Sequence, residues 1–264
     1  MIDLLVYIPT LGRENTQITL QWIPDRWKDR VFLVCPKSEN HIWENRVDVP
    51  NECIGDIGKT RQFIIENSPS KFVGMMDDDL TMYYRDPVDK VKRTKIEFIG
   101  EYLDMMESWL NEGDVYCSQS NTFMSHTRDE EYYYGKPSHT HFLNRDYLAE
   151  HNIRFDDIKY FEDFHIPLSI LQSGSRLRIS GNYVAAEKEA NAAGGCSINR
   201  TAANNKEAML QLRKLHPKYI KLKAVDGAKN QNLDVGLRMT ISWKKTYMDN
   251  VVNRGKGIDA ILCG

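Results

Sequence analysis

Short apolar runs alternate with helical patterns in the first part of the chain. Segments 3–8, 30–36 and 71–76 are apolar and rich in β-branched residues, which is typical of buried strands. A helix-like pattern separates the first two segments, and 56–67 has helical spacing before the third. Strands that alternate with helices indicate βαβ units. The pattern therefore predicts an α/β fold.

The rest of the chain mixes helical spacing with one polar, aromatic stretch. Residues 121–141 hold a tyrosine triplet and three histidines, and we expect a binding loop there. Apolar spacing predicts helices over 96–110, 161–172 and 204–215, and strands over 176–180 and 238–243. We expect one Rossmann-like domain with a mixed central sheet, divided into a catalytic core over 1–199 and a segment over 200–264 that packs on it.

Composition limits the class of protein. With 264 residues, 41% of them hydrophobic, the chain is able to bury a core, which excludes disorder as the main state. Its apolar runs are too short to cross a bilayer, and no basic segment precedes a long apolar one at the N-terminus. Five scattered cysteines without a Cys-x-x-Cys pair indicate neither a disulfide framework nor a thiolate zinc site. We expect a soluble cytoplasmic protein.

Charge is divided unevenly along the sequence. Residues 1–199 hold 22 Lys and Arg against 32 Asp and Glu, whereas residues 200–264 hold 13 against 5. A basic C-terminal segment suits a polyanionic partner such as nucleic acid. Solvated lysine faces of ordinary helices give the same excess, so both interpretations stay open.

Three adjacent carboxylates, Asp77, Asp78 and Asp79, follow the strand predicted over 71–76. They repel one another unless a cation holds them. In an extended segment Asp77 and Asp79 point the same way, so they are able to share Mg²⁺ or Mn²⁺ and leave coordination sites for phosphate. A solvated acidic turn is the alternative. The carboxyl end of a strand, where α/β sheets bind ligands, favours the metal site.

A second acidic pair, Glu162 and Asp163, begins the helix predicted over 161–172. Carboxylates at such positions also serve as caps or favour the helix dipole. Together with a metal-bound diphosphate, the same pair supplies a general base toward an acceptor hydroxyl. We assign the base to Asp163, with Glu162 as the alternative base or as an acceptor contact.

Segment 55–60 approaches a phosphate-binding P-loop but does not match it. The first glycine of that motif is replaced by Cys53, which disfavours a P-loop kinase. A helix N-terminus with Lys59 and Arg61 nearby still suits a diphosphate. We expect the turn after the first strand, which carries Arg13, to lie at the same edge of the sheet.

These features together resemble the GT-A class of nucleotide-sugar glycosyltransferases, over roughly residues 1–180. The matching elements are the loop 8–13, the helix start 58–61, the Asp triplet as a version of the DxD signature, and the pair 162–163. Segments 58–61, 77–80 with Arg85, and 191–196 are also similar to phage glycosyltransferases related to the base J glucosyltransferase group, which modify hydroxymethylated pyrimidines in DNA.

The resemblance implies a metal-dependent glycosyltransferase with a UDP-sugar donor. Asp77 and Asp79 would reach the metal and the diphosphate, and Asp163 would deprotonate the acceptor hydroxyl in an inverting displacement. His216 is the candidate for a further metal ligand, although a structural role at the end of a helix fits it equally. The favoured acceptor is a hydroxymethylpyrimidine, or an already glycosylated base, in phage DNA, flipped out of the duplex. No membrane and no stable protein partner is expected.

Other readings of the same sequence stay open. The acceptor is alternatively a glycan, a lipid or a protein, and further alternatives are a magnesium-dependent phosphotransferase or nucleotidyltransferase and a non-catalytic nucleic-acid-binding protein. His139 and His141 alternatively complete the metal site. The donor contacts that we predict are Pro9, Thr10, Arg13, Asp56, Lys59, Arg61, Asp77, Asp78 and Arg200. The acceptor contacts that we predict are Tyr133, Tyr134, His139, His141, Arg145, Gly194 and Gly195.

Overall fold

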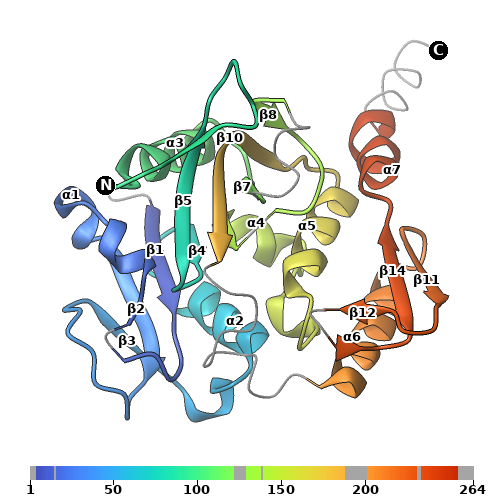
Figure 1. Ribbon diagram of the computed structural model, residues 1–264, viewed down its shortest axis with the longest axis horizontal. Helices are drawn as coiled ribbons and strands as arrows, with labels where there is room; N and C mark the ends of the chain where they lie inside the picture. The colour runs from blue at the N-terminus through green and yellow to red at the C-terminus, as the bar shows by residue number, and fades with distance from the viewer. Residues whose placement is uncertain are drawn as a thin grey trace.

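A mixed β-sheet covered by helices forms the body of the protein, and a smaller C-terminal segment lies beside it (Figure 1). The computed structural model describes residues 4–14, 16–121, 129–137, 139–187, 201–230 and 233–254. The strands lie in the order β3-β2-β1-β4-β9-β7-β10-β5-β6, and β8 pairs with β10. Their bounds are β1 Leu4–Pro9, β2 Val31–Pro36, β3 Arg46–Val49, β4 Phe72–Met76, β5 Leu80–Arg85, β6 Arg93–Lys95, β7 Tyr116–Asn121, β8 Glu131–Tyr132, β9 Thr140–Asn144 and β10 Arg178–Glu187.

Helices cover both faces of this sheet. They are α1 Asp25–Lys28, α2 Ile57–Asn67, α3 Gly100–Asn111, α4 Arg145–Glu150 and α5 Glu162–Ser173. The even-numbered apolar residues of β1 pack in the core that α3 covers, and the odd-numbered ones pack in the core that α2, α4 and α5 cover. This alternation is the two-residue period of a strand buried on both faces. The βαβ arrangement is confirmed, since β1 pairs in parallel with both β2 and β4.

The sheet is mixed because β9 enters it antiparallel between β4 and β7. Its register pairs Met76 with Thr140 and Phe72 with Asn144. The beginning of β9 therefore lies beside the end of β4, where the Asp triplet begins, and Arg145 lies a full strand length away. The loop expected over 121–141 is therefore wrong at residues 140 and 141, and likewise at 121, 131 and 132, which belong to β7 and β8.

The Asp triplet itself is not extended. Asp78 and Asp79 form a turn, and the chain reverses there from β4 into β5. The expectation that Asp77 and Asp79 share one face of an extended strand is therefore wrong. The immediate return into β5, which pairs with β10, requires this turn.

The C-terminal segment packs against α5 (Figure 1, orange to red). It comprises α6 Ala202–Leu215, the antiparallel pair β11 Ile220–Ala224 and β14 Leu237–Ile241, the short pair β12 Lys229–Asn230 and β13 Leu233–Asp234, and α7 Trp243–Tyr247. A third apolar core joins Phe161 and Leu168 of the α5 region to Met209 and Leu212 of α6. None of the helices in the described ranges is long and apolar enough to cross a membrane.

Candidate functional site

Arg61, on α2, joins two acidic groups that are far apart in the sequence. Its Nη2 donates to Oδ1 of Asp77 at 2.8 Å, and its Nη1 donates to Oε1 of Glu162 at 2.7 Å. The Arg61 side chain is 4% exposed and that of Glu162 is 8% exposed. The planar guanidinium presents its donors in a rigid fork, so one side chain fixes the direction of both carboxylates. The structure thus brings the Asp triplet and the acidic pair of α5 together.

A buried histidine contacts the same nitrogen of Arg61 that donates to Glu162. Nε2 of His141 lies 3.2 Å from Nη1 of Arg61, and Nδ1 lies 2.9 Å from the Tyr116 hydroxyl. Because arginine only donates, Nε2 is the acceptor of a neutral ring and Nδ1–H donates to Tyr116. Burial and the charge of Arg61 lower the pKa of His141 well below its usual value. His141 is 1% exposed and positions Arg61, which differs from the predicted acceptor contact.

Side chains of the loop after β1 donate hydrogen bonds to the Asp triplet. The hydroxyl of Thr10 donates to Oδ2 of Asp78 at 2.5 Å. Nη1 of Arg13 donates to Oδ1 of Asp78 and, at 3.0 Å, to Oδ2 of Asp79. Pro9 ends β1 directly before this loop. The structure therefore places the predicted donor contacts of this loop on the triplet itself.

The carboxylates of the triplet differ in their electrostatic surroundings. Burial raises the pKa of Asp77, but a hydrogen bond from His139 and the charge of Arg61 outweigh it and lower that pKa to about 2. Burial raises the pKa of Asp78 to about 6, against the hydrogen bond from Thr10 and the charge of Arg13. Asp77 therefore remains ionised under physiological conditions, and it offers a fixed negative charge at the surface of the site.

Asp163 lies at the start of α5, directly after Glu162. Its side chain is 30% exposed, and its Oδ2 lies 3.3 Å from Nζ of Lys136. Arg61 holds the preceding residue, so the beginning of α5 is fixed relative to the triplet. Glu162 and Asp163 thus differ. The Glu162 side chain is buried in its ion pair with Arg61, whereas the Asp163 side chain is partly exposed beside Lys136.

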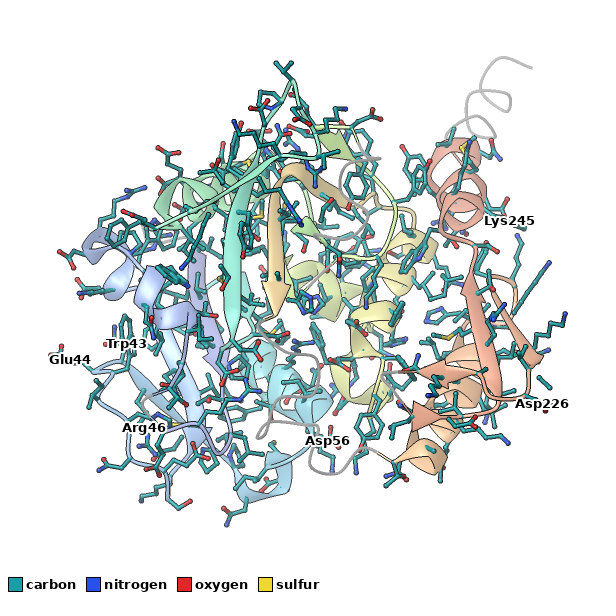
Figure 2. The ribbon with its side chains drawn as sticks, in the orientation of Figure 1. Trp43, Glu44, Arg46, Asp56, Asp226 and Lys245 are labelled. Carbon is teal, nitrogen blue, oxygen red and sulfur yellow. The ribbon has the colours of Figure 1, made fainter. Side chains whose placement is uncertain are left out.

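The start of α2 approaches the chain before α5 very closely. A Cβ added to Gly58 would meet the carbonyl oxygens of Phe155 and Ile158 at 2.8 Å, so only glycine fits. Asp56, labelled in Figure 2, caps the helix by accepting from the Lys59 N–H at 3.2 Å. This close approach brings Arg61 within reach of Glu162. Helix capping explains the position of Asp56, which was predicted as a contact of the sugar donor. The Lys59 side chain is exposed.

Several predicted acceptor contacts lie away from the triplet. Tyr134 stacks on Tyr247 of α7, with ring centroids 5.3 Å apart. The ring of Tyr133 lies 4.7 Å below the guanidinium of Arg176. Arg145 is at the opposite end of β9 from the triplet, where it donates to the Ser68 carbonyl. These side chains have partners within the protein that explain their positions.

His216 lies outside the triplet. Its Nε2 is 2.9 Å from Nδ1 of His165 on α5, and its Nδ1 contacts Oε1 of Gln172. Both ring nitrogens therefore have partners on α5, an arrangement that joins the end of α6 to that helix. Three further predicted residues lie outside the described residues, namely Gly194, Gly195 and Arg200.

The sequence analysis missed two residues of this site. Lys136 contacts Asp163, and Tyr116 orients His141. Lys136 lies in the polar stretch that was expected to bind a ligand, and its charge opposite an acidic helix start was the available signal. Tyr116 carried no signal, because a tyrosine that begins an apolar strand is indistinguishable from an ordinary core residue.

The donor set at the triplet fits a hard divalent cation. Asp77 and Asp79 have side chains 30% and 18% exposed at the same turn. Nδ1 of His139 lies 3.5 Å from Oδ2 of Asp77 and donates a hydrogen bond to it, so this nitrogen supports the carboxylate and is not itself a metal ligand. Mg²⁺ is commonly held by one or two carboxylates together with substrate phosphates. Within the described ranges no group of three or more His, Cys, Asp and Glu side chains is placed to hold a metal alone.

Comparisons with known proteins agree with this fold. A family model described as TET-associated glycosyltransferase matches residues 4–195. Staphylococcus aureus TarS 1–349 in complex with UDP-GlcNAc matches at 14% identity and a TM-score of 0.52, over 82% of this chain and 67% of that chain. The same fragment with UDP matches at 13% identity and a TM-score of 0.49, over 82% and 66%. GalNAc-T7 with UDP, GalNAc and Mn²⁺ matches at 10% identity and a TM-score of 0.42, over 70% and 43%.

The chain thus spans about two thirds of the length of the TarS fragments. A search of curated protein sequences found no match. The α/β, GT-A-like fold with a mixed sheet, which the sequence predicted, is confirmed by the likeness to TarS.

Proposed function

Because the chain belongs to the TET-associated glycosyltransferase family, we propose that this glycosyltransferase moves a sugar from a UDP-sugar to a hydroxymethylpyrimidine base in DNA. The family's description supports a base-modifying setting. The fold shared with TarS, which was solved with UDP-GlcNAc, supports the choice of a UDP-sugar as donor.

One observation carries the catalytic part of the proposal, namely the Arg61 contacts to Asp77 and Glu162. They bring the Asp triplet and the start of α5 to opposite sides of one guanidinium. A transferase with an inverting mechanism needs a leaving diphosphate and a general base on opposite sides of the reacting carbon. In this arrangement the triplet serves the diphosphate, and Asp163 serves the acceptor.

Asp77 and Asp79 would hold a divalent cation, Mn²⁺ or Mg²⁺, which supplies positive charge to the leaving diphosphate when bound. The chain's own residues do the remaining work. Arg13 and Thr10 fix the turn that carries both carboxylates, and Arg61 orients Asp77. Lys59, exposed on the first turn of α2, adds a positive charge at a helix N-terminus.

Asp163 would accept the proton of the acceptor hydroxyl. As the acceptor oxygen bonds to the anomeric carbon, the bond from that carbon to the diphosphate breaks, and UDP leaves with the electron pair. Lys136, at 3.3 Å from Asp163, holds this partly exposed carboxylate in an ion pair. The Glu162 side chain is buried in its ion pair with Arg61. This favours a role for Glu162 in positioning Arg61 and favours Asp163 as the general base.

The charge of the C-terminal segment bears on the choice of acceptor. The basic segment 200–264 supports DNA, because phosphate contacts by lysine and arginine dominate nucleic-acid affinity. A glycan, lipid or protein acceptor is the second candidate, favoured only if that segment is an ordinary solvated surface.

Transfer of labelled sugar tests the proposal. A panel of UDP-sugars, with Mn²⁺ or Mg²⁺, is offered with DNA that contains hydroxymethylpyrimidines and with unmodified DNA. We expect label on the modified DNA only. Metal-dependent UDP release without labelled DNA would reject the acceptor, and the absence of UDP release with every donor would reject the donor as well.

A further inference from the structure

A cavity of about 420 Å³ lies between the start of α5 and the C-terminal segment. Its wall includes Phe164 of α5, Met239 of β14 and Trp243 of α7, and its rim includes Lys136, Lys229 and Arg238. Of the described residues that line it, three are cations and none is acidic. This volume is in the range of pockets that take small organic groups. The cavity therefore combines an aromatic wall with a positively charged rim.

The cavity lies next to the proposed base. Nζ of Lys136 is 3.3 Å from Oδ2 of Asp163 and 4.5 Å from the ring centroid of Phe164. The rings of Phe164 and Trp243 lie 6.3 Å apart at 23°. Lys136 and Phe164 thus connect Asp163 to Trp243 through direct contacts. A group that stacks on Trp243 would therefore lie two side chains, Phe164 and Lys136, away from the carboxylate of Asp163.

The basic rim continues along the surface of the C-terminal segment. Lys223 pairs with Arg238 in the β11–β14 register, and Lys221 pairs with Thr240, so their side chains share the exposed face of the ribbon, whereas Met239 lies on the opposite face, toward the cavity. Lys245 of α7 lies at the outer edge of the same segment (Figure 2), where its Nζ pairs with Asp249 at 3.0 Å. Phosphates spaced along a strand would meet successive cations on this face.

We infer that this cavity takes the acceptor base of a DNA strand, stacked on Trp243 with its flanking phosphates on Lys229 and Arg238. The inference rests on the proposed function and adds the acceptor site to it. Enzymes that modify a base take it out of the stack, and aromatic rings receive it because every base has a π-face. A cavity for an acidic peptide would need the cations but not the aromatic wall.

Binding of a labelled oligonucleotide to the full chain tests the inference. One short single-stranded probe carries a central hydroxymethylcytosine, and its partner carries an abasic residue at that position. We expect the abasic probe to bind about ten-fold more weakly, because base–aromatic stacking is lost. Trp243→Ala should abolish the difference between the probes, and Trp243→Phe should keep most of it.

The charged rim has its own measurement. Arg238→Gln and Lys229→Gln should each reduce the slope of log affinity against log salt by about 1. Lys92→Gln is the matched control, since it removes one exposed lysine between β5 and β6 and should leave the slope unchanged. These variants keep the inference testable even if Trp243→Ala does not fold.

Three results would overturn the inference: equal affinity of the wild-type protein for both probes, an unchanged difference in Trp243→Ala, or displacement of the probe by an acidic peptide of equal charge. Metal-dependent UDP release by the wild-type protein is measured in parallel. Release together with base-independent binding would reject the cavity and retain the proposed function. Base-dependent binding that requires Trp243, without UDP release, would retain the cavity as a nucleic-acid site and reject the function.

Discussion

Replacement of Arg61 with methionine should destabilise the protein by about 3–5 kcal/mol, because it removes one partner of a buried ion pair. The Glu162 carboxylate, with a side chain only 8% exposed, would then lose its 2.7 Å partner without gaining water. Asp77 contributes less to the loss, since its side chain is 30% exposed and remains partly hydrated.

The size of the Glu162 contribution follows from a double-mutant cycle. Glu162→Gln removes the charge that Arg61→Met strands, so the double variant should recover about 1–3 kcal/mol of the sum of the single losses. Urea unfolding, followed by tryptophan fluorescence, gives the free energy of unfolding by linear extrapolation. Arg26→Met is the control, because Arg26 is 55% exposed in its pair with Asp104 and should cost under about 1 kcal/mol.

A loss below about 1 kcal/mol for Arg61→Met, or additive effects of the two substitutions, would refute this reasoning. Arg61 would then be held by something other than the two carboxylates, and a direct contact with the donor diphosphate would become the better explanation of its position.

Four further outcomes are expected. Asp79→Asn should abolish metal-dependent UDP release while circular dichroism stays unchanged, and retained turnover would remove the residue from the metal site. Asp163→Asn should lower transfer by about 10²-fold or more with UDP-sugar affinity unchanged in calorimetry, whereas lost donor binding would refute the base. Gly58→Ala should cost about 1–3 kcal/mol in urea unfolding, because its Cβ would meet two carbonyl oxygens at 2.8 Å, and a neutral effect would refute the close approach. The contribution of His216 to stability should fall by about 2 kcal/mol between pH 7 and pH 5, so His216→Gln should reduce the measured pH dependence by about that amount.

The sign of the pH effect follows from His216. Burial and the nearby His165 lower the pKa of His216 from 6.5 to about 3. The unfolded chain therefore takes up a proton below pH 6.5, whereas the folded protein resists it until about pH 3. The stability that neutral His216 contributes is complete above pH 6.5 and is lost progressively as the pH falls from 6.5 to about 3. An identical pH dependence in the variant would contradict it.

The sequence pattern predicted those strands and helices whose burial depends on residues close together in the chain. The three parallel strands and helices α2, α3, α5 and α6 lie within a few residues of their predicted positions, because burial of one strand or one helix face leaves a period in the sequence. Strand β9 left no such period. Its buried Thr140 and His141 find partners on neighbouring strands and helices, so polar residues occupy a central strand there.

The candidate site was predictable in its residue types but not in its contacts. The Asp triplet and the acidic pair were identified from their positions after a strand and before a helix. Arg61 was expected to face a diphosphate, whereas its partners are 16 and 101 residues away and depend on how α2 packs against the chain before α5. The turn at Asp78 depends likewise on β5, which pairs with a strand almost a hundred residues later.

Helix α5 belongs to two apolar cores at once. Ile166 and Ile170 pack under the sheet, and Leu168 packs with the C-terminal segment. Opening of the C-terminal segment therefore removes one of the two cores that support α5, which carries Asp163 in its first turn, so the two should exchange amide hydrogens as one cooperative unit. A ligand that orders the C-terminal segment must, by linkage, also order this helix. An acceptor that binds there would tighten the position of the carboxylate that we propose as its base.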